Sequence, residues 1–348
     1  MLIPHSRPSI DESEISAVSK VLRSQYLAEG LKVGEFQDRL SSYIGRRYAL
    51  AVNSGTSALH LALLSLRIKR QDEVIIPSFV CAAVLNAVNL IGARPKIADI
   101  NESDFNINID STKKLISRRT KAVIVPHMFG TAADIDGFLK LGIPIIEDCA
   151  LSIGATYKGK KVGGFGKLSV FSFYATKVIT TAEGGAVLTN ESKLYAFILD
   201  LRNYDNRQNY NLRYNYKMSD LSSAMGIAQL KKLPKFIRRR QNIARQYNFG
   251  LSGLGLKLPI AEANKSHIYY RYIIRGKNKA NRLISRLRRF GIEAKRPIFK
   301  PLHSYLGLKD KDFPVASSVY NTALSLPIYP GLQDAKVKFI IDKVRLVI

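Results

Sequence analysis

Short apolar segments alternate with amphipathic segments over the first 200 residues of the chain. Uninterrupted apolar runs predict buried strands at 47–52, 73–76, 94–99, 121–126, 144–147, 168–173 and 186–189. Apolar residues at helical spacing predict helices near 9–24, 33–43, 80–91, 110–117, 132–140 and 191–202. We assign Ser9 as the N-cap of the first helix, with Glu12 completing a capping box. Strands that alternate with helices predict an α/β fold with a mainly parallel sheet and helices on both faces.

The pattern changes after residue 202. Residues 203–216 are polar and rich in tyrosine, which indicates a long loop with a functional or interfacial role. A long helix at 219–248 then leads into a smaller unit with a strand at 268–275, a helix at 278–290, a short strand near 292–296 and a last helix near 333–345. We therefore expect a large domain over residues 1–240 and a small C-terminal α+β domain over residues 241–348.

Composition narrows the class of protein. The 348 residues are 46% hydrophobic, which suffices for a large core. No apolar run reaches membrane-spanning length and the N-terminal segment lacks a signal-peptide core, so we expect a cytoplasmic protein with no membrane span. Two cysteines and five scattered histidines do not have the spacing of a metal site, so no metal is predicted.

The charge is the unusual feature, because 54 basic and 27 acidic residues give a net charge of +27. Such an excess is compatible with nucleic acid, an anionic membrane surface or an anionic substrate. The most basic segment, 231–245, fits a solvated helix face, and the chain has no recognisable nucleic-acid-binding module. The sequence therefore does not favour nucleic acid as a partner, and an anionic substrate is compatible with the charge.

Candidate chemistry lies between residues 144 and 190. Asp148 follows an apolar strand, at the end of the strand where open α/β sheets bind ligands. Lys177 follows the next strand and is the only charged residue from 168 to 182. Each residue alone fits a helix cap or a solvated surface lysine. Together they suggest pyridoxal phosphate, which needs a lysine amine for its aldehyde and an acidic partner for its ring nitrogen.

A second candidate feature is the turn from a strand into a helix at residues 53–63. Gly55 allows a ligand to approach the backbone, and the N–H groups of Thr56, Ser57 and Ala58 at the helix start can bind an anion. The Thr56 and Ser57 hydroxyls add donors. An ordinary capped turn is the alternative for this segment taken alone.

These segments, in their order and spacing, are similar to a known family. The matching stretches are SRPSID (6–11), NSGTSALHLAL (53–63), DEVIIPSF (72–79), IIEDCA (145–150), FSFYATK (171–177), EGGAV (183–187), YNYKMSDLSSAMGIAQL (214–230), KPLH (300–303), FP (313–314) and LSLPIYP (324–330). The chain resembles the DegT-type nucleotide-sugar aminotransferases, fold-type-I enzymes that depend on pyridoxal phosphate. The resemblance covers nearly the whole chain.

The resemblance implies a role for each matching residue. Lys177 is the Schiff-base lysine, and Asp148 is the partner of the cofactor's ring nitrogen. The phosphate cradle consists of Gly55, Thr56, Ser57 and Ser172.

Asn215 matches an asparagine that reaches the cofactor phosphate of the neighbouring subunit, which implies a homodimer with shared active sites. Lys217 and His303 lie at the substrate end, and a structural role is the alternative for His303.

Two residues depart from the family pattern. Leu151 stands where a residue that hydrogen-bonds the cofactor's phenolic oxygen is usual, and Cys81 stands where many members have an aromatic residue. The predicted function is conversion of a nucleotide-linked keto-sugar to an amino-sugar, with glutamate as amino donor. The alternatives are a pyridoxal phosphate enzyme of another reaction type on a related sugar, and a non-catalytic basic binding protein on this scaffold.

Overall fold

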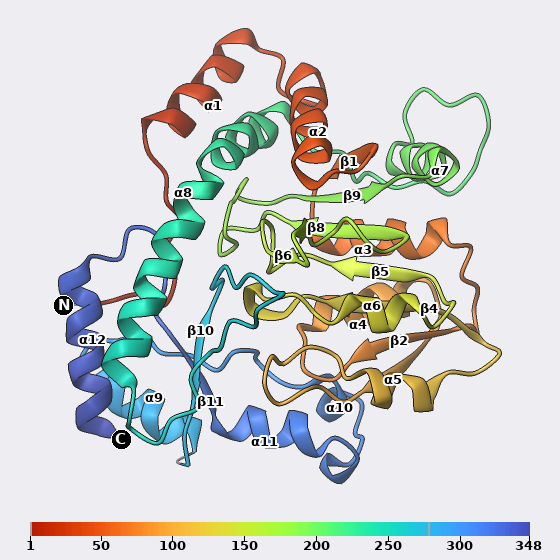
Figure 1. Ribbon diagram of the computed structural model, residues 1–348. Helices are drawn as coiled ribbons and strands as arrows, with labels where there is room; N and C mark the ends of the chain where they lie inside the picture. The colour runs from red at the N-terminus through yellow and green to blue at the C-terminus, as the bar shows by residue number, and fades with distance from the viewer. Residues whose placement is uncertain (1, 278) are drawn as a thin grey trace.

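A seven-stranded sheet forms the centre of the large part of the molecule (Figure 1). The structure is a computed structural model that describes residues 2–277 and 279–348. The strand order is β1-β9-β8-β5-β4-β2-β3, and β9 alone runs antiparallel to its neighbours. The strands are β1 Tyr48–Val52, β2 Glu73–Pro77, β3 Arg94–Ala98, β4 Thr120–Pro126, β5 Ile145–Asp148, β8 Leu168–Ser172 and β9 Gly185–Thr189. The predicted mainly parallel sheet is therefore confirmed.

Helices cover both faces of this sheet, with α3 and α4 behind it and α5 and α6 in front of it in Figure 1. The helices of this part are α1 Glu12–Ser24, α2 Leu31–Ile44, α3 Gly55–Ser65, α4 Ala82–Leu90, α5 Ile109–Leu115, α6 Ile135–Leu139 and α7 Ser192–Arg202. A short 3-10 turn, η1 Met128–Gly130, follows β4, and a two-stranded ribbon is formed by β6 Thr156–Tyr157 and β7 Lys160–Lys161. The central strands are buried along their length, which explains why their sequences are apolar without alternation.

The long helix α8, Asp220–Leu251, connects two hydrophobic cores. Its first half packs against α1 and α2, and its second half packs against α12. Side chains of α8 up to Phe236 belong to the core of the sheet, and those from Ile243 onward belong to a second core. This change supports a domain boundary near residue 240, which remains a prediction.

The second core lies around a two-stranded antiparallel sheet of β10 Tyr272–Arg275 and β11 Ala323–Leu326. The other elements of this part are α9 Ala280–Arg289, α10 Leu302–Tyr305, η2 Asp310–Asp312, α11 Pro314–Thr322 and α12 Asp334–Val347. The N-terminal segment joins this unit, because Ile3 is fully buried in the second core and pairs with Ile292. None of the described helices has both the length and the apolar character needed to cross a membrane.

The assignment of Ser9 as the first N-cap is wrong. Helix α1 begins at Glu12, and Asp11 caps it in a capping box with Glu14. Ser9 is used in a tertiary contact instead, since its carbonyl accepts a hydrogen bond of 2.9 Å from Gln229 on α8. A long-range bond thus decides between two overlapping capping patterns.

The small unit differs from the prediction in three places. The strand expected from 268 begins only at Tyr272, because Ile268 and Arg271 donate their N–H groups to Gly130 and Phe129 instead of to β11. The strand expected near 292–296 is reduced to isolated bridges, and β11 was not predicted. The helix expected at 278–290 is Ala280–Arg289, and residue 278 lies outside the described residues.

Candidate active site

A cavity of 270 Å³ lies where β4 and β5 end, beside the turn after β8 and the segment that precedes β10. Its wall includes both Asp148 and Lys177, which sequence reasoning placed in one site. The remaining wall residues are Val80, Cys81, Pro126, Met128, Phe129, Ala150, Leu151, Thr176, Tyr270, Arg271, Pro297, Ile298 and Phe299. The cavity thus combines one carboxylate and two cationic side chains with a largely apolar wall.

Asp148 is held at the end of β5 with little exposure. Its Oδ1 accepts a hydrogen bond of 3.0 Å from the Ala150 N–H. Within residues 2–277 and 279–348, no hydrogen bond reaches Oδ2. Burial raises the pKa of the Asp148 carboxyl, while the Ala150 N–H and the charge of Lys177 oppose the shift. A cationic ligand atom beside Asp148 would favour its ionised form.

The neighbouring Glu147 holds the strand ends together beneath the cavity. It accepts hydrogen bonds from the N–H groups of Gly163 and Gly166 and from the His127 ring at 2.9 Å. Burial opposes ionisation, but these hydrogen bonds outweigh it and hold the pKa of Glu147 below its usual value.

His127, Glu147 and Cys149 lie close enough together to suggest a metal cluster. Both ring nitrogens of His127 are already engaged, one by Glu147 and the other by the Ala133 N–H at 3.0 Å. This network is therefore a structural support for Asp148.

Lys177 lies in the turn after β8, half-buried, with its Nζ 5.6 Å from the centroid of the Tyr270 ring. No described carboxylate forms a salt bridge with it. Burial alone would raise the pKa of the Tyr270 hydroxyl, but the charges of Lys177 and Arg271 outweigh burial and lower it. The Lys177 amine is thus available to a ligand in the cavity.

The start of α3 lies against the ends of β8 and β9. A Cβ placed on Gly55 would lie 2.8 Å from the Ser172 Cβ, so only glycine permits this approach without a shift. The structure therefore brings Gly55, Thr56, Ser57 and Ser172 together.

The predicted set of free N–H groups is wrong in part. Ser54 caps the helix and accepts the Ser57 N–H at its Oγ and the Ala58 N–H at its carbonyl. Among the described residues, the N–H groups of Gly55 and Thr56 keep no protein acceptor and can bind an anion.

Asn215 and Lys217 lie beside the end of β1. The helix α3 begins three residues after β1 ends, at Gly55. The Asn215 carbonyl accepts a hydrogen bond of 3.1 Å from Asn53, and Lys217 pairs with Val52 in an isolated bridge. The Asn215 residue is exposed, whereas the Lys217 amine forms an ion pair with Asp205. The roles of Asn215 toward a neighbouring subunit and of Lys217 toward substrate remain predictions.

His303 lies outside the cavity wall and is only 1% exposed. Its Nδ1 is hydrogen-bonded to Ser78, and its Nε2 lies 3.0 Å from Asp310. The ring also stacks on Phe313. These contacts favour the structural alternative, in which His303 ties α10 to the loop after β2.

Both departures from the family pattern lie at the cavity wall. Leu151 is half-buried and Cys81 is exposed, and each lines the same cavity as Lys177. The sequence reasoning missed Tyr270 and Arg271. The signal was present, because Arg271 is the only charged residue in the aromatic and apolar run from 268 to 274.

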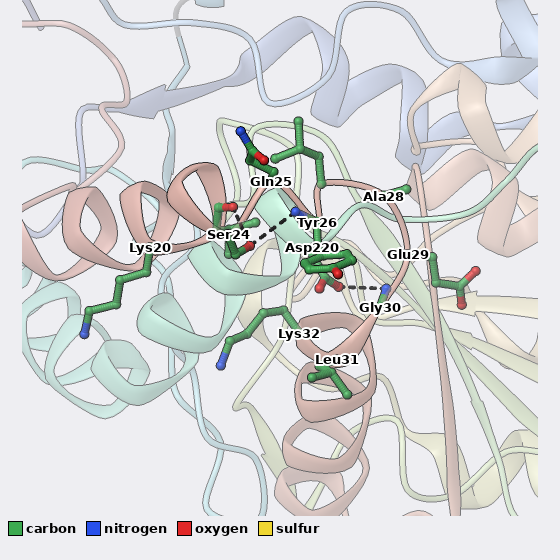
Figure 2. Close-up of a pocket in the computed structure, with 12 residues that line it drawn as sticks. Lys20, Ser24, Gln25, Tyr26, Ala28, Glu29, Gly30, Leu31, Lys32 and Asp220 are labelled. Carbon is green, nitrogen blue, oxygen red and sulfur yellow. Dashed lines mark hydrogen bonds between the residues drawn. The ribbon is translucent and has the colours of Figure 1, made fainter.

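A larger hollow of 660 Å³ lies elsewhere, between the end of α1 and the start of α2 (Figure 2). Asp220 lines this hollow and accepts a hydrogen bond of 2.9 Å from the Gly30 N–H. Tyr26 and Leu31 are 82% and 89% exposed at its wall. The hollow has no residue in common with the cavity around Lys177.

Comparisons with known proteins agree on one family. The model of the DegT/DnrJ/EryC1/StrS aminotransferase family matches residues 8–345. The GDP-perosamine synthase of Vibrio cholerae is 34% identical over 362 residues, which cover 99% of this chain and 98% of that protein. A UDP-4-amino-4,6-dideoxy-N-acetyl-beta-L-altrosamine transaminase of Campylobacter jejuni is 39% identical over 257 residues, which cover 69% of this chain and 67% of that protein.

The solved structures agree with this result. Spr1654 of Streptococcus pneumoniae, designated a sugar aminotransferase, superposes in its PMP form with a TM-score of 0.95 at 28% identity, covering 100% of this chain and 98% of that chain. Its PLP form gives a TM-score of 0.94 at 27% identity with the same coverage. The predicted fold class and the resemblance are confirmed: this chain belongs to the DegT/DnrJ/EryC1/StrS aminotransferase family.

Proposed function

We propose that this chain transfers an amino group from glutamate to the keto group of a nucleotide-linked sugar, as a cytoplasmic homodimer with shared active sites. The predicted enzyme class and pyridoxal phosphate dependence are confirmed by the family and by the PLP and PMP forms of Spr1654. The observation that carries the proposal for this chain is that Asp148 and Lys177 line one cavity.

The residues present fit pyridoxal phosphate at three of its polar groups, the ring nitrogen, the aldehyde and the phosphate. A buried carboxylate with one oxygen free of described partners, Asp148, suits a ring nitrogen. The Lys177 amine, which forms no salt bridge with a carboxylate of the described residues, suits an aldehyde. The open N–H groups at the start of α3, beside Ser172, suit a phosphate.

The residues divide the chemical work accordingly. When bound, pyridoxal phosphate supplies an aldehyde that accepts amines and a ring that delocalises electrons. The Asp148 carboxylate would accept the ring N–H and keep that nitrogen protonated. The Nζ of Lys177 would hold the aldehyde carbon in the resting enzyme and, once released, carry a proton to and from the substrate. Gly55, Thr56 and Ser172 would fix the phosphate.

The substrate class follows from the relatives. The names of the Vibrio cholerae and Campylobacter jejuni proteins both describe nucleotide-linked sugars, one with GDP and one with UDP. We therefore infer a nucleotide-linked keto-sugar for this chain, and the net charge of +27 is compatible with an anionic substrate.

Exposed apolar side chains support the proposed homodimer. Tyr26 and Leu31 lie in the hollow between α1 and α2, and Tyr210 in the 203–216 loop is 94% exposed. Arg202, just before this loop, forms an ion pair with the half-buried Glu29 in the hollow's wall, so the start of the loop lies near the hollow. Exposed apolar groups of this kind mark protein interfaces.

The test is a pair of half-reactions. Purified enzyme loaded with pyridoxal phosphate is mixed with L-glutamate, and the change in cofactor absorbance is followed. The product form is then offered a panel of UDP- and GDP-linked keto-sugars. We expect glutamate to convert the cofactor and one sugar to reverse the change, with Lys177→Ala inactive in both steps. A wild-type enzyme that binds the cofactor but reacts with no amino acid would refute the proposal.

A further inference from the structure

Arg271 is a second cationic residue in the wall of the cavity that contains Lys177. Its guanidinium carbon lies 5.1 Å from the centroid of the Tyr270 ring, and Lys177 Nζ lies 5.6 Å from the same centroid. The two cationic groups are therefore at most about 11 Å apart, the sum of these distances. Nothing in the proposed cofactor site uses Arg271.

Arg271 is half-buried, and its partners differ from those of three buried arginines of the chain. Arg46 lies 3.6 Å from Glu147, and Arg202 and Arg275 form ion pairs with Glu29 and Glu102. The fourth buried arginine, Arg240, donates to backbone carbonyls. Among the described residues, no carboxylate forms a salt bridge with Arg271. Its charge is therefore available to an anionic ligand in the cavity.

Arg271 contacts the ring of His5, where a buried arginine usually contacts a carboxylate. One guanidinium nitrogen of Arg271 lies 2.7 Å from Nδ1 and 2.9 Å from Nε2 of His5, and a neutral ring accepts a hydrogen bond at only one of them. The Nε2 of His5 also lies 2.9 Å from the Ser325 hydroxyl. Burial lowers the pKa of His5 well below its usual value, and the charges of Arg271, Lys295 and Arg240 lower it further. A neutral imidazole thus orients the guanidinium and leaves its charge uncompensated.

The backbone of Arg271 is fixed as well. Its N–H donates to the Phe129 carbonyl at 3.4 Å, and the Ile268 N–H donates to the Gly130 carbonyl at 2.8 Å. Phe129 has a positive φ of 54°, a conformation that tertiary contacts must hold in place. The tight turn at 128–130 therefore fixes Arg271 against the cavity.

We propose that Arg271 binds the carboxylate of the amino-acid donor and that His5 is a positioning residue that orients it. The inference rests on the proposed function, since it assumes an amino-acid donor. A guanidinium matches a carboxylate in shape and charge, because its two N–H groups can bond both oxygens. The carboxylates of glutamate lie within about 6 Å of its nitrogen, by ordinary bond lengths. The separation of at most about 11 Å between the Lys177 and Arg271 charges is compatible with an amino acid that contacts both side chains.

The size of the cavity favours the donor over the nucleotide. Its 270 Å³ falls below the lower end, about 300 Å³, of ordinary ligand pockets. A nucleotide diphosphate is larger than an amino acid, so it fits less well beside the cofactor in this volume. A single carboxylate fits both the space and the charge.

The experiment compares Arg271→Met with Arg282→Met, a matched control on the exposed face of α9. Binding of 2-oxoglutarate, UDP and GDP is measured by calorimetry on the loaded enzyme, and the glutamate half-reaction is measured separately. We expect Arg271→Met to lower the affinity for 2-oxoglutarate and for glutamate by about 10- to 100-fold, the range for hydrogen bonds to charged groups. UDP and GDP binding should stay within threefold, and Arg282→Met should match the wild type throughout.

His5 is tested through its dependence on Arg271. His5→Ala should lower the affinity for 2-oxoglutarate by less than Arg271→Met does. His5→Gln keeps a hydrogen-bond acceptor, so its affinity should be close to that of the wild type. The double variant His5→Ala/Arg271→Met should bind no more weakly than Arg271→Met alone, because one residue acts through the other. A merely structural role for His5 would add to the effect.

Three results overturn the inference: unchanged 2-oxoglutarate binding in Arg271→Met, a loss confined to UDP or GDP, and an equal loss of all ligands. Failure of the proposed function has a different signature, which is a wild-type enzyme inert in the glutamate half-reaction. The calorimetric comparison does not need turnover, so it decides the role of Arg271 in either case.

Discussion

Replacing Gly185 by alanine should damage the proposed phosphate cradle without touching a ligand directly. A Cβ on Gly185 would lie 2.4 Å from the Ser54 carbonyl oxygen and 2.7 Å from the Gly55 nitrogen. Both are backbone atoms at the start of α3, so no side chain can turn away. Because non-bonded heavy atoms pack at about 3.5 Å, the start of α3 must move away from β9 by about 1 Å.

The expected cost has two parts. Overpacking of this kind destabilises a protein by about 1–3 kcal/mol. A shift of about 1 Å also takes a hydrogen bond between a backbone N–H and a phosphate beyond its useful length. Each such charge-assisted bond contributes about 1.5–3 kcal/mol, so we expect cofactor affinity to fall by about 10- to 100-fold or more.

The assay is titration of the apoenzyme with pyridoxal phosphate, followed by absorbance, together with thermal unfolding. Gly34→Ala is the matched control, since no heavy atom of the described residues is found within 4 Å of a Cβ added at this position on α2. That change should leave cofactor affinity unaltered and stabilise the helix by about 0.5–1 kcal/mol. Gly185→Ala with wild-type cofactor affinity would refute the placement of the phosphate at the start of α3.

Three further predictions concern other residues. Leu151→Gln should raise cofactor affinity by about 1 kcal/mol or shift the absorbance, and an unchanged spectrum and dissociation constant would mean that Leu151 only packs. Glu147→Gln should destabilise the fold to urea by about 3–5 kcal/mol, because Arg46 would stay buried without its partner. Since the pKa of Glu147 is held low, its contribution is present above the unfolded-state value and lost as pH falls through the folded-state value. The variant should lack this part of the acid dependence, and an equal acid slope would contradict the account. Inactive Lys177→Ala and Asn215→Asp chains, once their subunits exchange, should together regain activity in part if Asn215 acts across the dimer; no recovery would place Asn215 in its own subunit's site.

The sequence predicts the sheet well because its strands are buried on both faces. Such strands have uninterrupted apolar runs, and these runs are visible without any knowledge of neighbours. Ser9 and the short strand near 292–296 were mispredicted because tertiary bonds decided both. The Gln229 side chain donates a hydrogen bond to the Ser9 carbonyl, and Ile292 pairs with Ile3 of the N-terminal segment.

The site residues also divide into those that local sequence predicts and those that only tertiary contacts bring together. Asp148 and Lys177 follow consecutive predicted strands, and the carboxyl ends of parallel strands lie at one edge of a sheet, so the sequence predicts that the two residues share a site. Arg271 and His5 are 266 residues apart, and nothing local links them. Their contact depends on the N-terminal segment joining the small unit, which sequence patterns do not encode.

The most direct test of the central claim is to identify the lysine that holds the cofactor. The loaded enzyme is reduced with borohydride and digested, and the peptides are examined by mass spectrometry. The expected result is one modified peptide that carries the pyridoxyl group on Lys177. This peptide should be absent in Lys177→Ala, while the variant keeps its fold by circular dichroism. A pyridoxyl group on another lysine, or a reduced enzyme with no modified peptide, would contradict it.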